Sequence, residues 1–193
     1  MQRSLLVGIP FMMCGGYVAV KWMLAGSLNA ERLVAVGGMY HWTALTLLTV
    51  GMSMWFLRER RNTGSFWGDF KQLSQPLVLY AVLASGTVWT WNHVIDAEST
   101  ALRKALRIAQ IEEHTANDDA YQEFVASQAQ TSETLNLPGR TAYREQAMAQ
   151  VNWMLSGGVT FVLSLLTYLF AAVMLALLAT ALLHHIWGLS TLS

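Results

Sequence analysis

Two histidines are the residues whose type and spacing could do chemistry. His41 and His93 lie in separate apolar stretches of the chain, and we expect both towards the same side of a membrane. Two helical histidines that face each other can ligate a haem iron from both sides. Both histidines would have to lie at the same depth to bind one haem, but their expected depths differ by several residues. The alternative for both is hydrogen bonding near the membrane interface.

The other candidate groups have simpler interpretations. His184 and His185 close the last apolar stretch, where an imidazole can contact the exposed carbonyls at a helix C-terminus. Asp96 and Glu98 open a polar segment. Two such carboxylates can serve acid–base catalysis. In the first turn of a helix, however, they interact favourably with the helix dipole, and this structural role is the simpler interpretation. The sequence has no phosphate loop, no nucleophile elbow and no Cys or His pair at metal-ligand spacing. It therefore predicts neither an enzyme nor a metal site.

The elements that would position these residues are four apolar stretches, each long enough to cross a bilayer, which takes about 20 residues. They cover residues 4–26, 33–57, 75–94 and 158–183. Of the 193 residues 12% are charged, against about 25% in soluble domains. Lys21 is the one formally charged residue inside these stretches. We expect its aliphatic side chain to extend along the helix so that the ammonium group reaches the interface. The sequence predicts an all-α integral membrane protein, a single membrane domain with four transmembrane helices.

The charge pattern argues against two functional classes. Proton and ion carriers place Asp, Glu, Lys or His at mid-depth of the membrane, and the four stretches contain no carboxylate. Transport or channel activity is therefore disfavoured. The formal net charge is zero, so nothing points to nucleic acid as a partner.

The connector at residues 58–74 combines basic and aromatic side chains. These are Arg58, Arg60 and Arg61, followed by Phe66, Trp67 and Phe70. The dense basic run next to the membrane places this connector and both chain termini in the cytoplasm. The aromatic spacing predicts a short helix lying in the interface, with Asp69 and Lys71 turned to water. It forms a membrane-surface elbow or, as the alternative, a site for lipid headgroups.

A polar insert at residues 95–157 separates the third and fourth stretches. The absence of Gly and Pro from 87 to 137 allows the third span to continue as one long helix into this insert. Leu102, Leu106 and Ala109 form an apolar stripe at helical spacing. About sixty residues make a small core, so the stripe must pack on its own helical hairpin, on the bilayer or on a partner. We predict an extramembrane helical insert with this stripe as a partner contact.

The order of these features resembles a known family. The connector reads Arg58-Glu59-Arg60-Arg61 and then Gly64-x-Phe66-Trp67-x-x-Phe70-Lys71, the third span ends in Val94-Ile95-Asp96, and a polar helical insert precedes the last span. This pattern is similar to the bacterial domain-of-unknown-function family numbered four-one-nine-nine, which comprises small four-helix inner-membrane proteins. The family usually has proline where Ala97 stands. The resemblance implies a bacterial cytoplasmic membrane location, and it does not imply any particular activity.

The leading functional hypothesis is an accessory or scaffolding subunit of a larger bacterial membrane protein complex, without catalysis of its own. Its expected partners are membrane lipids and other membrane protein subunits. One alternative is a haem-binding redox subunit that uses His41 and His93; otherwise no cofactor is expected. Another alternative is a small lipid- or solute-binding membrane protein.

Overall fold

The computed structural model describes residues 3–59, 65–129 and 139–190, and every regular element in these ranges is helical. The elements are α1 (Arg3–Leu24), α2 (Ala30–Glu59), α3 (Phe66–Thr90), the π-helical turn η1 (Trp91–Ile95), α4 (Ala97–His114), α5 (Asp118–Ala129), α6 (Arg140–Met154) and α7 (Gly157–Ser190). The prediction of an all-α fold is confirmed. The chain divides into a first unit, Met1–Trp91 with Phe161–Ser193, and a second unit, Asn92–Thr160.

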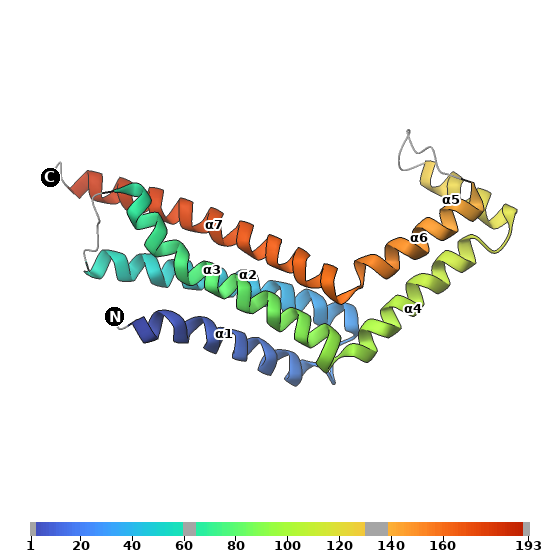
Figure 1. Ribbon diagram of the computed structural model, residues 1–193, viewed down its shortest axis with the longest axis horizontal. Coiled ribbons are helices and arrows are strands. Elements are labelled where there is room, and N and C mark those ends of the chain that lie inside the picture. The colour runs from blue at the N-terminus through green and yellow to red at the C-terminus, as the bar shows by residue number, and fades with distance from the viewer. Residues whose placement is uncertain (1–2, 60–64, 130–138, 191–193) are drawn as a thin grey trace. The chain divides into compact units, whose positions relative to one another are not determined.

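The first unit is an antiparallel bundle of α1, α2, α3 and most of α7. The starts of α1 and α3 lie at the same end of the bundle as the ends of α2 and α7 (Figure 1). Helix α3 is the most enclosed, since Leu77, Tyr80 and Ala84 have no exposed surface. Ala172 and Ala176 of α7 are also fully buried, so the small residues of the last span pack inside the bundle, which lets helix backbones approach closely.

Three helices of the described chain are long and apolar enough to cross a membrane. The qualifying segments are Val7–Leu24, Glu31–Glu59 and Gly157–Ile186. Their outward faces carry large apolar side chains such as Phe11, Leu47 and Phe170, as expected of surfaces that meet lipid. Helix α3, which contains most of the predicted third span, is not among the three, because polar residues such as Ser74 and Gln75 lower its mean hydropathy.

The start of α3 differs from the sequence prediction. One helix runs through Phe66–Thr90 in place of a separate surface helix followed by a span from residue 75. Pro76 lies inside this helix, where it removes one backbone hydrogen bond, and the helix changes direction along this part (Figure 1). Lys71 is exposed as expected, but Asp69 is fully buried rather than turned to water. The end of α7 covers it.

The second unit contains α4, α5 and α6. Its small core is an aromatic cluster of Tyr121, Phe124 and Tyr143, with ring centroids 5.3–6.3 Å apart. Arg140 joins the elements, because its guanidinium contacts Asp118 at 2.8 Å and donates to the carbonyl oxygen of Thr115 at 3.2 Å. Burial, reinforced by the neighbouring Tyr121, raises the pKa of the Tyr143 phenol.

Helix α3 does not continue into α4 as one α-helix. The backbone widens into the π-helical turn Trp91–Ile95 and then bends at Asp96. The hydroxyl of Thr100 donates to the carbonyl oxygen of Asn92 at 2.7 Å. This side-chain bond satisfies a backbone acceptor that the regular helix would have paired, which is why the break needs neither glycine nor proline.

Candidate functional site

Lys21 is enclosed in the first unit, which corrects the expectation that it reaches the interface. The residue is 2% exposed. Its Nζ lies 4.9 Å from the centroid of the Trp91 ring and 5.5 Å from that of Tyr17, so the cation rests on two aromatic faces. Tyr17 precedes Lys21 by one helical turn on α1, the spacing at which side chains meet. A buried cation in a membrane-crossing helix is rare and marks a candidate functional site.

His41 lies in the core of the same unit. Its ring centroid is 4.3 Å from that of Tyr17 and 5.1 Å from that of Tyr168. Its Nδ1 is 2.8 Å from the hydroxyl oxygen of Tyr80. When that hydroxyl donates to Nδ1, the imidazole is neutral and carries its proton on Nε2. Nε2 is buried and has no hydrogen-bond partner among the described residues.

Together these side chains form what we call the Lys21–His41 cluster. Its members come from α1, α2, α3 with η1, and α7: Tyr17, Lys21, Tyr40, His41, Tyr80, Trp91 and Tyr168. The sequence reasoning missed all of them except His41 as site residues. The available signal was a tyrosine inside every one of the four apolar stretches, since a phenol buried among apolar side chains needs a polar partner.

Glycines make room for the cluster. A Cβ at Gly16 would lie 2.5 Å from the hydroxyl oxygen of Tyr40, and one at Gly37 would lie 3.2 Å from Cε2 of Tyr17. The Tyr40 hydroxyl in turn donates to the carbonyl oxygen of Met13 at 2.7 Å. Gly16 and Gly37 therefore admit tyrosine rings between α1 and α2.

The Tyr80–His41 hydrogen bond yields a direct prediction. Tyr80→Phe keeps the ring but leaves His41 Nδ1 buried without its partner, which costs about 1–3 kcal/mol of the free energy of unfolding. Thermal unfolding of the purified protein in one detergent would measure the loss. Tyr17→Phe is the matched control, because the structure shows no hydrogen bond of the Tyr17 hydroxyl among the described residues. Equal losses in the two variants would contradict the prediction.

A second polar contact lies at the bundle end where α3 begins. His184 Nε2 donates to Oδ2 of Asp69 at 2.9 Å, and the Phe66 ring lies 5.5 Å from the imidazole. Asp69 has no exposed surface, whereas His184 is 30% exposed. The histidine expected to contact helix carbonyls instead joins the end of α7 to the start of α3.

The packing at His41 does not fit an axial haem ligand. An axial histidine needs enough open space beside its ligating nitrogen for the whole haem plane. At His41 this space is lacking, because aromatic rings from other helices enclose the imidazole. His93 belongs to the second unit, where its Nε2 is 3.2 Å from the hydroxyl oxygen of Thr160. Both imidazoles thus have hydroxyl neighbours, in agreement with hydrogen-bonding roles.

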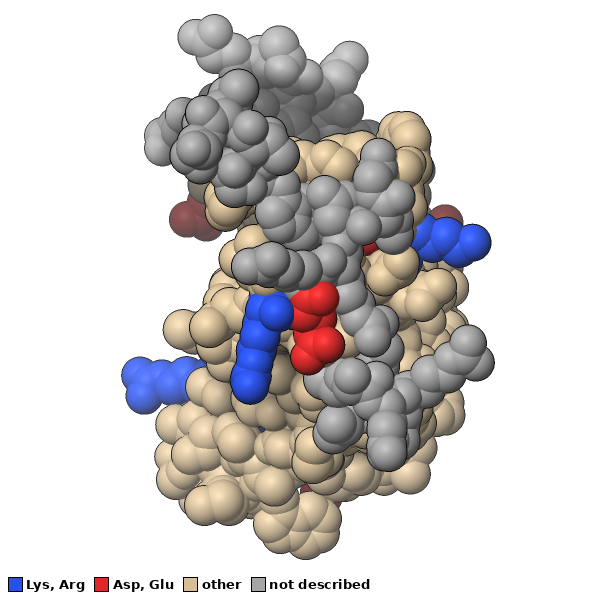
Figure 2. All heavy atoms as spheres, turned by 90° about the vertical axis from the view of Figure 1, so that its left-hand side faces the viewer, with Lys and Arg blue, Asp and Glu red and all other residues tan. Residues whose placement is uncertain are grey.

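Among the described residues of the predicted lipid-headgroup site, the three aromatic side chains do not share one face. Phe70 packs against the bundle core and Phe66 lies on His184, whereas Trp67 is mostly exposed. Arg58 is exposed at the end of α2. Arg60 and Arg61 lie outside the described residues. Figure 2 views this end of the bundle, where a few charged side chains emerge among the uncharged side chains of the described residues.

The predicted partner stripe on α4 is exposed in the second unit. Leu102 is 58% and Leu106 57% exposed, and Ala109 is also exposed. On another side of α4, Glu112 bonds to Arg144 of α6 at 3.3 Å. The hairpin therefore does not cover the stripe.

Comparison of the chain with protein-family models, with curated proteins and with solved structures found no significant match.

Proposed function

We propose that the chain is a four-span bacterial inner-membrane protein that acts as an accessory or scaffolding subunit of a larger membrane complex, with no catalysis of its own. Three of its helices are apolar enough to cross a membrane. Helix α3 is the fourth span in this proposal, and its lower hydropathy has a physical reason. Residues such as Leu77 and Ala81 face neighbouring helices, so α3 presents less surface to lipid and tolerates more polar residues.

The alternating helix directions support an orientation. If all four helices cross the membrane, the starts of α1 and α3 and the ends of α2 and α7 lie on one side (Figure 1). Arg58 and Lys71 are exposed at that end. The positive-inside rule then places this end in the cytoplasm, in keeping with the family resemblance.

The observation that carries the subunit proposal is the uncovered apolar face of α4. Leu102 and Leu106 are more than half exposed on a helix whose flanking positions include Arg103 and Arg107. An amphipathic helix that leaves its apolar face open within its own unit is typical of a surface that packs on another chain. A membrane protein subunit that packs against this face is the partner we propose.

Charge placed on this face is expected to abolish partner binding. In the double variant Leu102→Glu with Leu106→Glu, two buried carboxylates would oppose packing, and we expect at least a tenfold loss of co-purified partner. The measurement is affinity isolation from native membranes in a mild detergent, with quantitative mass spectrometry of the proteins retained.

The matched control carries the same added charge elsewhere on the second unit. Gln110→Glu with Gln122→Glu alters two exposed polar positions and should retain the partner. Retention by the stripe variant, or the absence of any stoichiometric partner of the unaltered chain, would contradict the subunit proposal. An absorption spectrum of the same sample tests the haem alternative, because a Soret band would require His41 and its aromatic neighbours to repack.

A further inference from the structure

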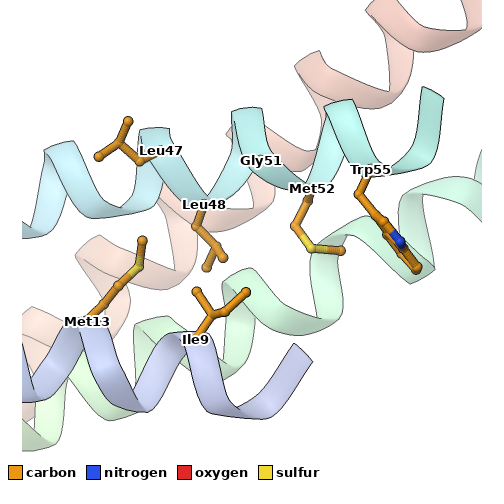
Figure 3. Close-up of a pocket in the computed structure, with 7 residues that line it drawn as sticks. All are labelled: Ile9, Met13, Leu47, Leu48, Gly51, Met52 and Trp55. Carbon is orange, nitrogen blue, oxygen red and sulfur yellow. The ribbon is translucent and has the colours of Figure 1, made fainter. Parts of the chain in front are cut away.

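An apolar hollow opens between α1 and α2 in the first unit (Figure 3). Ile9 and Met13 of α1 line it from one side, and Leu48 and Met52 of α2 from the other. Its volume is about 160 Å³. An apolar cavity of about 150 Å³ accepts a guest of the size of benzene. The hollow therefore has room for a short length of hydrocarbon chain.

Gly51 keeps the hollow open. It lies on α2 among the lining residues, it is exposed, and a Cβ built on it would meet nothing within 4 Å. Glycine is unfavourable inside a helix, and this position needs no close approach of another backbone. A larger side chain here would project into open space, so glycine accounts for part of the hollow.

The surroundings of the hollow limit what can fill it. Helices α1 and α2 are both long and apolar enough to cross a membrane, so the hollow opens onto hydrocarbon. Water has no polar partners there. A helix of another protein is about 10 Å wide and would need a longer groove. An acyl chain of a lipid matches both the width and the chemistry.

A positive charge lies beyond one end of the hollow. Trp55 is the lining residue nearest the end of α2, and the exposed Arg58 follows it by about one turn. Gly51 and Arg58 are separated by about 10 Å along the helix axis at 1.5 Å per residue. A lipid whose chain occupies the hollow would thus bring its headgroup to the guanidinium, which pairs well with phosphate. Glu59 is exposed beside Arg58 and Lys71 is exposed near the start of α3.

We propose that the hollow and Arg58 together bind one anionic phospholipid, with an acyl chain against Gly51 and the phosphate on Arg58. The acyl chain is as apolar in the bilayer as it is in the hollow, so the hydrophobic effect does not favour its binding. Close packing in the hollow and the headgroup charge supply the preference over bulk lipid. The inference requires that α1 and α2 cross the membrane and is independent of the subunit role.

Photo-crosslinking in vesicles of defined composition tests this site. The full-length protein is placed in phosphatidylcholine vesicles that contain a trace of phosphatidylglycerol with a photoactivatable acyl chain, and labelled peptides are mapped by mass spectrometry. We expect the label on the segments that contain Met13 and Gly51. Unlabelled phosphatidylglycerol should displace it, whereas phosphatidylcholine and a free fatty acid should compete weakly.

Two variants separate the chain contact from the headgroup contact. Gly51→Leu fills the hollow and should reduce labelling there to the level of the remaining lipid-facing surface. Arg58→Gln should lower the preference for phosphatidylglycerol over phosphatidylcholine about fivefold, the effect of one basic side chain at a membrane surface. The matched controls are Gly38→Leu, where a Cβ also meets nothing within 4 Å, and Arg32→Gln at the other end of α2.

Three results would overturn the proposal. These are equal labelling by the zwitterionic and anionic lipids, displacement by the free fatty acid as efficient as by phosphatidylglycerol, and unchanged labelling in Gly51→Leu. Thermal unfolding of every variant is measured in the same vesicles, so that a lost label in a folded protein reports the site. Neither these results nor their interpretation depends on whether a protein partner co-purifies.

Discussion

Trp91→Ala is expected to lower the free energy of unfolding by about 3–5 kcal/mol. The substitution leaves a cavity, which costs about 24 cal/mol per Å³ of unfilled volume, or about 2–3 kcal/mol for roughly 100 Å³. It also removes one of the two rings beneath the Lys21 cation, and a desolvated contact of this kind contributes about 2 kcal/mol. Trp91 is 2% exposed, so solvent or lipid cannot fill the space cheaply.

Equilibrium unfolding in mixed micelles measures this effect, with Trp22→Ala as its control. Trp22 follows Lys21 directly on α1 but is 68% exposed. Its truncation should change the free energy of unfolding by less than about 1 kcal/mol, because exposed substitutions are usually nearly neutral. A similar cost for both variants would show that Lys21 does not depend on its aromatic enclosure.

Asp69→Ala is expected to lower the free energy of unfolding by about 2–4 kcal/mol. A hydrogen bond to a charged group contributes about 1.5–3 kcal/mol, and truncation at this fully buried position also leaves a small cavity. Here the remaining His184 is 30% exposed and recovers part of its solvation, which reduces the cost. The loss should appear mainly as detachment of the start of α3 from the end of α7, seen as faster hydrogen exchange in residues 66–74 and after residue 180.

A double-mutant cycle with His184→Ala isolates the pair. We expect a coupling free energy of about 1–3 kcal/mol between the two substitutions. Glu59→Ala is the control, since this acid is exposed at the end of α2 in the same bundle and should have little effect. Additive losses for Asp69 and His184 would contradict a direct energetic role of their hydrogen bond.

The Lys21–His41 cluster and the Asp69–His184 hydrogen bond have the same effect on helix packing. Helices surrounded by lipid gain nothing from the hydrophobic effect when they associate, so packing and polar contacts decide which faces meet. The Lys21–His41 cluster joins all four helices of the first unit, and the Asp69–His184 bond joins α3 to α7. These contacts specify which faces of the four helices meet.

The sequence by itself determined the helical class, the apolar helices and the polar insert. Long apolar runs, such as the one in α7, can satisfy their backbone groups in lipid only as helices, so composition and length were sufficient. It also identified Leu102 and Leu106 as an apolar stripe, because spacing along one helix is a local property. The identity of whatever packs on that stripe is not a local property and stays a prediction.

Only the tertiary structure decided where the polar side chains lie. A lysine at the end of a span can reach water or turn inward, and the inward position of Lys21 depends on rings from α1 and η1 that come together only in the folded bundle. Asp69 was expected at the water side because the aromatic residues around it were placed on the membrane side of a surface helix, yet its partner His184 comes from the far end of the chain. Periodicity reports the surroundings of one helix, whereas burial of a charge depends on what the other helices bring to it.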